Sequence, residues 1–145
     1  DIGKAILRLR FPNHFKELLR KAEQENRTLI SAERELLGFT HADIGFELAR
    51  AWNLAPAVSM AIAFHHNPQA ASLHRRLAAL VHVADVKARE FAIGFSGDRQ
   101  KLSMSEFARR VVLNCDRIDN HRDEIAQRVD AMLSEGRVDE AVVAA

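Results

Sequence analysis

The stretch Ala63-Phe64-His65-His66-Asn67-Pro68 decides how the rest of the chain is interpreted. It leads from an apolar helix to a proline, which cannot continue a helix because it lacks a backbone N–H and its ring clashes with the preceding turn. Adjacent residues of a helix point about 100° apart, so the two imidazoles can reach neighbouring points only at a helix end. A histidine pair in this position is a candidate pair of metal ligands.

Other candidate ligands come from separate segments, at Asp1, His41 and Asp85. His41 follows Thr40 at a predicted helix start, where the positive end of the helix dipole favours the neutral imidazole that a metal requires. Asp85 lies in the apolar run 80–86, where an unpaired carboxylate is costly. Imidazoles and carboxylates from several helices are what a metal site inside a helical bundle requires.

Each of these residues also has a simpler interpretation. His41 alone fits a surface histidine in a helix cap, and His65 could cap helix carbonyls while His66 stays solvated. Asp85 could form an ion pair with Arg89, four residues later on the same helix face, or contact His82, three residues earlier. Spacing alone leaves both interpretations open. For the remaining histidines we predict only surface or packing roles: His14, His74, His82 and His121.

Composition excludes several classes of protein. The chain has 145 residues, of which 48% are apolar and 28% charged, as in ordinary globular domains. A net charge of +1 gives no basic footprint for a nucleic-acid polymer or an anionic membrane. The single cysteine, Cys115, excludes an internal disulfide and indicates a reducing cytoplasm, and no signal peptide or membrane span is evident. Because the chain starts at Asp1 without methionine, we expect a piece of a longer protein.

Apolar residues recur at helical spacing and no alternating β-branched run occurs, so an all-α fold is predicted. The predicted helices cover about 2–9, 12–25, 31–37, 40–52, 56–66, 72–93, 103–113 and 117–134, and 95–101 is a predicted loop and the best candidate for disorder. Gly38 is expected to end the third helix and Gly136 the last. Thr40 to Asp43 is close to the pattern of a capping box, and Ser103 to Glu106 has the full pattern.

Two side-chain placements follow from the helical periodicity. Glu33 is expected to point outward or to cap its helix. In the long helix 72–93, we expect the core face to be formed by Leu73, Leu77, Leu80, Val81, Ala84, Ala88 and Phe91.

The order of the motifs resembles the HD superfamily of metal-dependent phosphohydrolases. The motifs are Asp-Ile-Gly-Lys at 1–4, Thr-His-Ala-Asp-Ile-Gly at 40–45, His-His-Asn-Pro at 65–68 and Val-His-Val-Ala-Asp at 81–85. Within that superfamily the chain is most similar to HDOD domains, the HD-related output domains of bacterial signalling proteins. The runs 32–41 and 52–56 support this resemblance, which covers residues 1 to about 97.

The resemblance implies an irregular HD-type helical bundle that lacks its N-terminal helices, with 1–145 as the C-terminal part of one domain and less specific helices at 103–135. It implies that the metal ligands are Asp1, His41, His65, His66 and Asp85. Asp1 matches the aspartate of the HD doublet, and Lys4 matches a lysine near the substrate phosphate in catalytic relatives. The metal would be a divalent transition ion such as Fe, Mn, Ni or Zn, and Asp1 and Lys4 are the candidate catalytic residues.

The chain departs from the catalytic HD-GYP relatives after the histidine pair. Those enzymes have an acidic residue and a Gly-Tyr-Pro signature, whereas here 67–72 reads Asn-Pro-Gln-Ala-Ala-Ser and the chain has no tyrosine. The resemblance therefore favours a regulatory module, without established catalysis, that acts on other signalling domains or proteins and binds a metal or a nucleotide. The alternative is a metal-dependent phosphohydrolase acting on a nucleotide or cyclic dinucleotide. A purely structural helical module is a third interpretation.

Without the upstream helices, the apolar side chains of Ile2, Ile6 and Leu9 would be exposed. We therefore expect the chain to self-associate.

Overall fold

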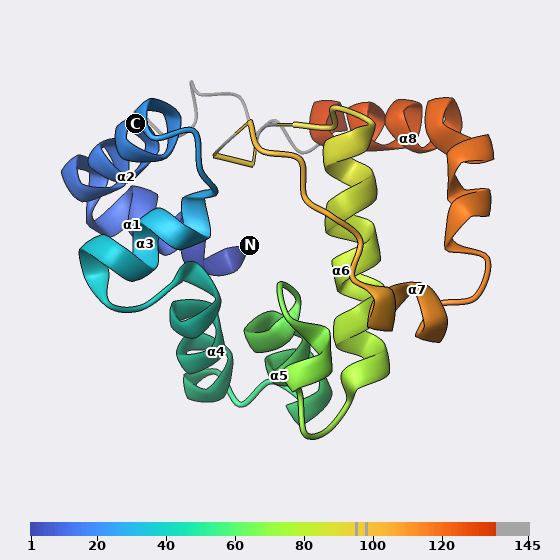
Figure 1. Cartoon of the computed structure of the whole chain (residues 1–145), viewed down its shortest axis with the longest axis horizontal. Coiled ribbons are helices and arrows are strands. Elements are labelled where there is room, and N and C mark those ends of the chain that lie inside the picture. Colours follow the sequence, from blue (N-terminus) through green and yellow to red (C-terminus); the bar gives the residue numbers. More distant parts are fainter. Residues whose placement is uncertain (95, 98, 136–145) are drawn as a thin grey trace.

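A computed structural model describes residues 1–94, 96–97 and 99–135. It is all-α, as predicted, and no strand occurs among these residues (Figure 1). The helices are α1 (Ile2–Arg10), α2 (Pro12–Gln24), α3 (Leu29–Leu37), α4 (His41–Ala51), α5 (Pro56–Phe64), η1 (Pro68–Ala70), α6 (Arg75–Glu90), α7 (Glu106–Val111), η2 (Cys115–His121) and α8 (Arg122–Glu135), where η marks a 3₁₀ helix. No helix of the described chain has both the length and the apolar character needed to cross a bilayer.

The boundaries of α3 and α4 follow the local sequence signals. Gly38 ends α3 in the left-handed conformation, with φ +78°, which costs glycine little because it has no Cβ. Thr40 and Asp43 form a reciprocal capping box at the start of α4, in which each side chain accepts a backbone N–H of the other residue. Both predictions are confirmed, and together they fix where His41 begins its helix.

The C-terminal half departs from prediction in three places. Helix α6 is shorter than 72–93, because His74 and Ala92 on either side of it adopt positive φ. Ser105, and not Ser103, caps α7, since its hydroxyl accepts the backbone N–H of Ala108. The predicted helix 117–134 is divided, with 3₁₀ helix η2 running to His121 before α8 begins. The predicted stop at Gly136 lies outside the described residues.

Two apolar clusters hold the helices together. The first joins α1, α2 and α3 through a buried group, Leu7, Leu18, Ala22, Leu29 and Ala32. The second joins α6 to α7 and η2 through another buried group, Ala79, Val83, Ala108 and Cys115. Helices α4 and α5 pack against each other and connect the two parts, α4 contacting α1 and α5 contacting α6 (Figure 1).

The predicted core face of helix 72–93 is wrong for three of its largest members. Leu73, which precedes α6, is 64% exposed, and Leu80 and Val81 on α6 are 51% and 37% exposed. The buried face carries the small residues Ala78 and Ala79, which let α6 approach its neighbours closely. Leucine spacing alone could not indicate this face, because both stripes of the helix are apolar.

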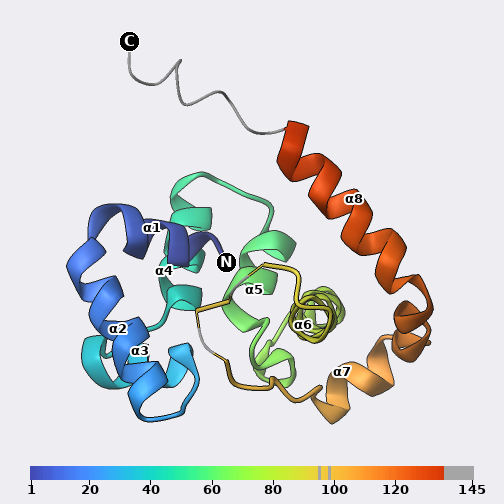
Figure 2. The ribbon, with the colours of Figure 1, turned by 90° about the horizontal axis from the view of Figure 1, so that it is seen from above.

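The two ends of the chain have different surroundings. The first residue lies in the middle of the molecule, between α1 and the α5–α6 pair (Figure 2). Helix α8 runs along the outside and contacts η2. Of the three apolar residues expected to be exposed on α1, Leu9 is 75% exposed, whereas Ile2 and Ile6 are half-buried. The missing upstream helices and self-association stay predictions.

Candidate metal centre

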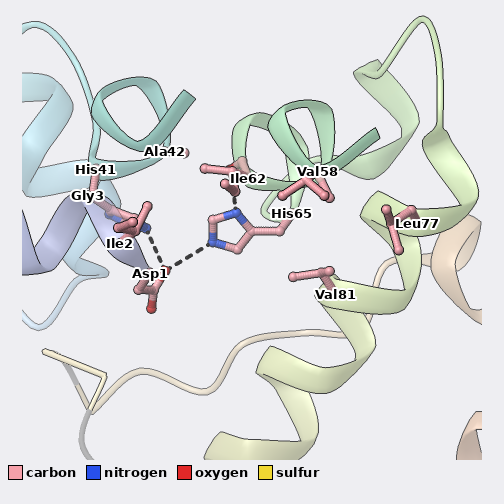
Figure 3. A pocket seen from close by; sticks show the side chains of 11 residues that line it. Asp1, Ile2, Gly3, His41, Ala42, Val58, Ile62, His65, Leu77 and Val81 are labelled. Atoms are coloured by element: carbon pink, nitrogen blue, oxygen red, sulfur yellow. Dashed lines mark hydrogen bonds and ion pairs between the residues drawn. The ribbon is translucent and has the colours of Figure 1, made fainter. Parts of the chain in front are cut away.

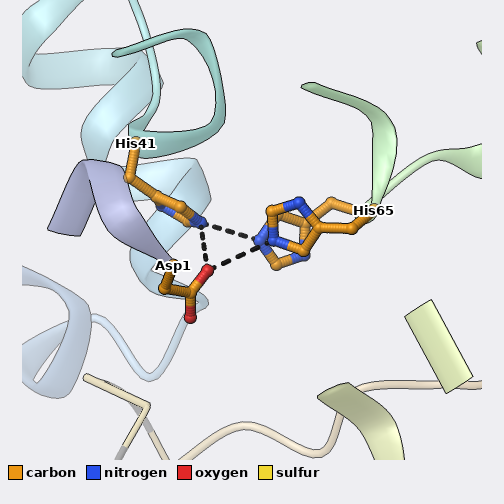
Figure 4. A group of neighbouring side chains, drawn as sticks. Asp1, His41 and His65 are labelled. Carbon is orange, nitrogen blue, oxygen red and sulfur yellow. Dashed lines mark hydrogen bonds and ion pairs between the residues drawn. The ribbon is translucent and has the colours of Figure 1, made fainter. Parts of the chain in front are cut away.

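Four of the predicted ligands meet at one point, where α1 and α4 begin and α5 ends (Figure 4). Asp1 is the N-cap residue of α1, but its side chain does not cap the helix and is directed at the site. His41 is the first residue of α4, and His65 follows the last residue of α5. One donor atom from each of Asp1, His41, His65 and His66 lies within 4.8 Å of the other three.

Three of the separations between these donor atoms are close to those of ligands around a single ion. Nε2 of His41 lies 3.3 Å from Oδ1 of Asp1, and Nε2 of His65 lies 3.2 Å from the same oxygen. Nε2 of His41 and Nε2 of His66 are 2.9 Å apart. Ligands about 2.1 Å from one ion, at tetrahedral or octahedral angles, are about 3.0–3.4 Å apart. The four side chains are therefore gathered closely enough to surround one ion.

The hydrogen bonds around the site direct lone pairs toward its centre. Nδ1–H of His65 donates to the carbonyl oxygen of Ile62 at 2.8 Å, so its Nε2 presents a lone pair to the carboxylate of Asp1. His66, when neutral, has one ring proton, so either its Nε2 faces His41 with a lone pair or its Nδ1 faces Asp85 with one. Among the described residues, Nε2 of His65 and Nδ1 of His66 are buried without a hydrogen-bond partner.

The histidines of the site do not gain a second proton near pH 7 that would occupy these lone pairs. Burial lowers the pKa of His65 to about 4, and burial together with the neighbouring His65 lowers the pKa of His66 to about 2. Burial also lowers the pKa of His41. All three imidazoles are therefore neutral near pH 7, which is the form that binds a metal. A divalent cation fits this site because it would satisfy lone pairs that no proton occupies.

Asp85 and Lys4 lie beside the four-donor group. Oδ2 of Asp85 is 3.9 Å from Nδ1 of His66, and Oδ1 is 3.4 Å from Nε of Arg89, the pairing that the simpler interpretation required. Nζ of Lys4 donates to Oδ2 of Asp1 at 2.7 Å and to the carbonyl oxygen of Ser96 at 3.0 Å. Asp85 is thus not one of the four donors that meet at the site, whereas Lys4 contacts Asp1, which is one of them.

Sequence reasoning missed the most deeply buried acidic residue of the site. Glu33 was expected to point outward or to cap its helix, but it is 0% exposed and accepts the ring N–H and the main-chain N–H of His41. The expectation was wrong because Glu33 lies four residues after Leu29 and four before Leu37, on the apolar face of α3. That spacing was the signal that could have found it.

His82 has a packing role, one of the two roles predicted for it. Its buried ring donates from Nδ1 to the carbonyl oxygen of His65 at 2.8 Å and accepts the backbone N–H of Ser105 at Nε2, at 3.1 Å. The ring therefore connects the end of α5 to the start of α7. This contact fixes the backbone that positions the histidine pair.

A cavity of about 260 Å³ adjoins the site (Figure 3). Asp1, His41 and His65 border it on one side. Most of its wall is apolar, and its lining includes Val58 and Ile62 of α5 and Leu77 and Val81 of α6. The donor group is thus next to space that water or a small ligand can enter.

Comparison with known proteins supports the resemblance seen in the sequence. Residues 1–68 match the family model of the HDOD domain. The comparisons with curated proteins and with solved structures found no match. The matched segment contains Asp1, His41, His65 and His66. Residues 1–68, just under half of the chain, are therefore similar to the HDOD domain.

Proposed function

We propose that this chain is a regulatory output module of the HDOD type, in which Asp1, His41, His65 and His66 hold one divalent transition-metal ion. The observation that carries the proposal is the convergence of buried, neutral imidazoles and a carboxylate at coordination distances. The missing Gly-Tyr-Pro signature supports a regulatory role over a hydrolytic one. Its partners would be other signalling domains or proteins in a bacterial cytoplasm.

The ion, when bound, would supply a cross-link between three helices. Asp1 belongs to the start of α1, His41 to α4, and the histidine pair to the end of α5, so one ion would fix their relative positions. A ligand that binds only the folded state stabilises it by about 2.7 kcal/mol at one hundred times its Kd. Metal occupancy could thus control how firmly the module holds the conformation that its partners contact.

The test is a metal titration of the full chain combined with a hydrolysis assay. We expect one Co²⁺ per chain, and no hydrolysis of cyclic dinucleotides or a phosphomonoester above buffer with Mn, Fe, Ni or Mg added. Metal-dependent turnover that Asp85→Ala abolishes would contradict the regulatory proposal. Failure to take up any transition metal would contradict the proposed metal site.

A metal-dependent phosphohydrolase is the second candidate, favoured by the positions of Lys4 and Asp85. Oδ2 of Asp85 is buried without a hydrogen-bond partner among the described residues, and it faces His66. Together with the four-donor group, Asp85 could hold a second ion. A metal-bound hydroxide is the nucleophile that attacks a phosphodiester in two-metal sites. Lys4 would then contact the substrate phosphate. Two ions per chain, and turnover lost in Lys4→Ala, are the results that would select this function.

A further inference from the structure

We propose that Glu33 is a positioning residue that holds His41 in its Nδ1–H tautomer, so that the Nε2 lone pair is directed at the metal site. The inference rests on the proposed metal-binding function. Glu33 is not among the donors that meet at the site, and it would act only through His41.

Two hydrogen bonds from one residue converge on a single oxygen of Glu33. Its Oε2 accepts the main-chain N–H of His41 at 2.9 Å and lies 2.7 Å from Nδ1 of the same residue. Because backbone and ring are both bound to this atom, the imidazole cannot rotate without breaking one of the contacts. A carboxylate at this position requires a proton on Nδ1, which leaves Nε2 as the acceptor that faces Asp1, His65 and His66.

A helix-capping role alone does not account for a carboxylate at this position. Thr40 and Asp43 already form the capping box of α4. Glu33 is fully buried, and its other oxygen, Oε1, has no hydrogen-bond partner within the described part of the chain. Burying a carboxylate so incompletely paired is unfavourable unless a nearby positive charge offsets it. An ion on the far side of His41 would supply that charge.

The arrangement has a chemical rationale in metal sites generally. A histidine ligand usually donates its second ring N–H to a carboxylate or a carbonyl, which fixes the tautomer and makes the coordinating nitrogen more basic. Within this site His65 uses the carbonyl oxygen of Ile62 in this way, and His41 uses Glu33. Losing such a partner typically lowers metal affinity about 10–100-fold.

The experiment compares the full chain with Glu33→Gln and Glu33→Met. The amide oxygen of glutamine can still accept both N–H groups but has no charge, whereas methionine keeps the length and removes the acceptor. Glu47→Gln is the control, because Glu47 lies on the exposed face of α4, where its carboxylate pairs with Arg50. The readouts are the His41 tautomer from long-range ¹H–¹⁵N NMR of the metal-free protein, the Kd for Co²⁺ by calorimetry, and the Tm.

We expect His41 to be the Nδ1–H tautomer in the parent chain and in Glu33→Gln, and to shift toward Nε2–H in Glu33→Met. Co²⁺ affinity should fall in Glu33→Gln and fall by about 10–100-fold in Glu33→Met. The metal-free Tm should stay constant or rise in Glu33→Gln, which keeps the acceptor and removes the buried charge. Glu47→Gln should match the parent. A parent chain with Nε2–H at His41, or a Glu33→Met variant with unchanged tautomer and Kd, would overturn the proposal.

Two further outcomes are decisive. If Glu33→Met does not fold, the parent tautomer and the Kd of Glu33→Gln decide the question, because an unchanged Kd in Glu33→Gln would overturn the role of the carboxylate. If the parent binds no Co²⁺ but shows the Nδ1–H tautomer at His41, the proposed metal site fails while the positioning of His41 by Glu33 stands.

Discussion

Gly3 is the point where the first helix lies closest to the metal-binding region, and replacing it by alanine tests whether this close approach matters. A Cβ added at Gly3 would lie 1.9 Å from the carbonyl oxygen of His41, 2.8 Å from its carbonyl carbon and 3.1 Å from the backbone nitrogen of Gly45. All three atoms belong to the backbone of α4, so no side-chain rotation can remove the clash. Helix α1 would have to move away from α4.

The sign of the effect distinguishes this clash from ordinary helix propensity. Alanine in place of glycine inside a helix stabilises by up to about 1 kcal/mol when nothing interferes. Overpacking costs about 1–3 kcal/mol, and backbone contacts belong at the upper end of that range. We therefore expect Gly3→Ala to lower the free energy of unfolding by about 2 kcal/mol, which for a chain of this size lowers the Tm by about 4–8 °C.

The assay is thermal unfolding by circular dichroism, combined with Co²⁺ titration. Because Asp1 and His41 lie on the two helices that would separate, the variant should also bind Co²⁺ more weakly. Gly45→Ala is the matched comparison, since its nearest neighbour is a methyl group of Ile62 at 2.7 Å, which can shift at a smaller cost. A Tm for Gly3→Ala equal to or above that of the parent would refute the reasoning.

Three other expectations concern pH, the ligand set and the C-terminal helices. Burial lowers the pKa of His65 from 6.5 to about 4, so between these pH values the unfolded chain binds a proton that the folded chain does not. The free energy of unfolding of the metal-free protein should therefore fall as the pH drops from about 6.5 to 4. Denaturant unfolding should show a weaker pH dependence for His65→Gln. Asp1→Asn should raise the Kd for the first Co²⁺ by at least about tenfold. Asp85→Asn should change this Kd by less, because Asp85 lies outside the four-donor group. Equal effects of the two substitutions in a Co²⁺ titration would contradict this ligand set. Lys87→Met should destabilise the chain by about 1–3 kcal/mol, because Nζ of Lys87 donates to Oδ1 of Asp119 at 2.7 Å and so joins α6 to η2. Amide hydrogen exchange near η2 should accelerate in the variant. Unchanged exchange would count against this link.

The sequence was most informative where local chemistry fixes local structure. Thr40 and Asp43 were predicted to cap a helix, and they do so because the capping contacts involve only neighbouring residues. Gly38 and Pro56 likewise end and begin helices where predicted. The cap of α7 was predicted at Ser103 but is Ser105, because the two serines offer the same local chemistry and the sequence alone does not distinguish them. Which of them lies near Nε2 of His82 depends on tertiary packing.

The candidate site was predictable in part. His41, His65 and His66 were singled out before any geometry, but proximity of donor atoms from three helices is a tertiary property that spacing cannot supply. Glu33 was missed because a glutamate among charged neighbours is ordinarily solvated, and its burial depends on how α3 packs. On α6, Leu80 was assigned to the core, although the apolar residues of the buried face are Ala78, Ala79, Val83 and Val86.

The most direct test of the metal centre is elemental analysis by mass spectrometry on the full chain, purified beside its His65→Ala/His66→Ala double variant, both after incubation with Co²⁺ and removal of unbound ion. We expect close to one metal ion per chain in the parent and almost none in the double variant, with both proteins helical by circular dichroism. Equal metal content in the two folded proteins, or none in either, would contradict the metal centre.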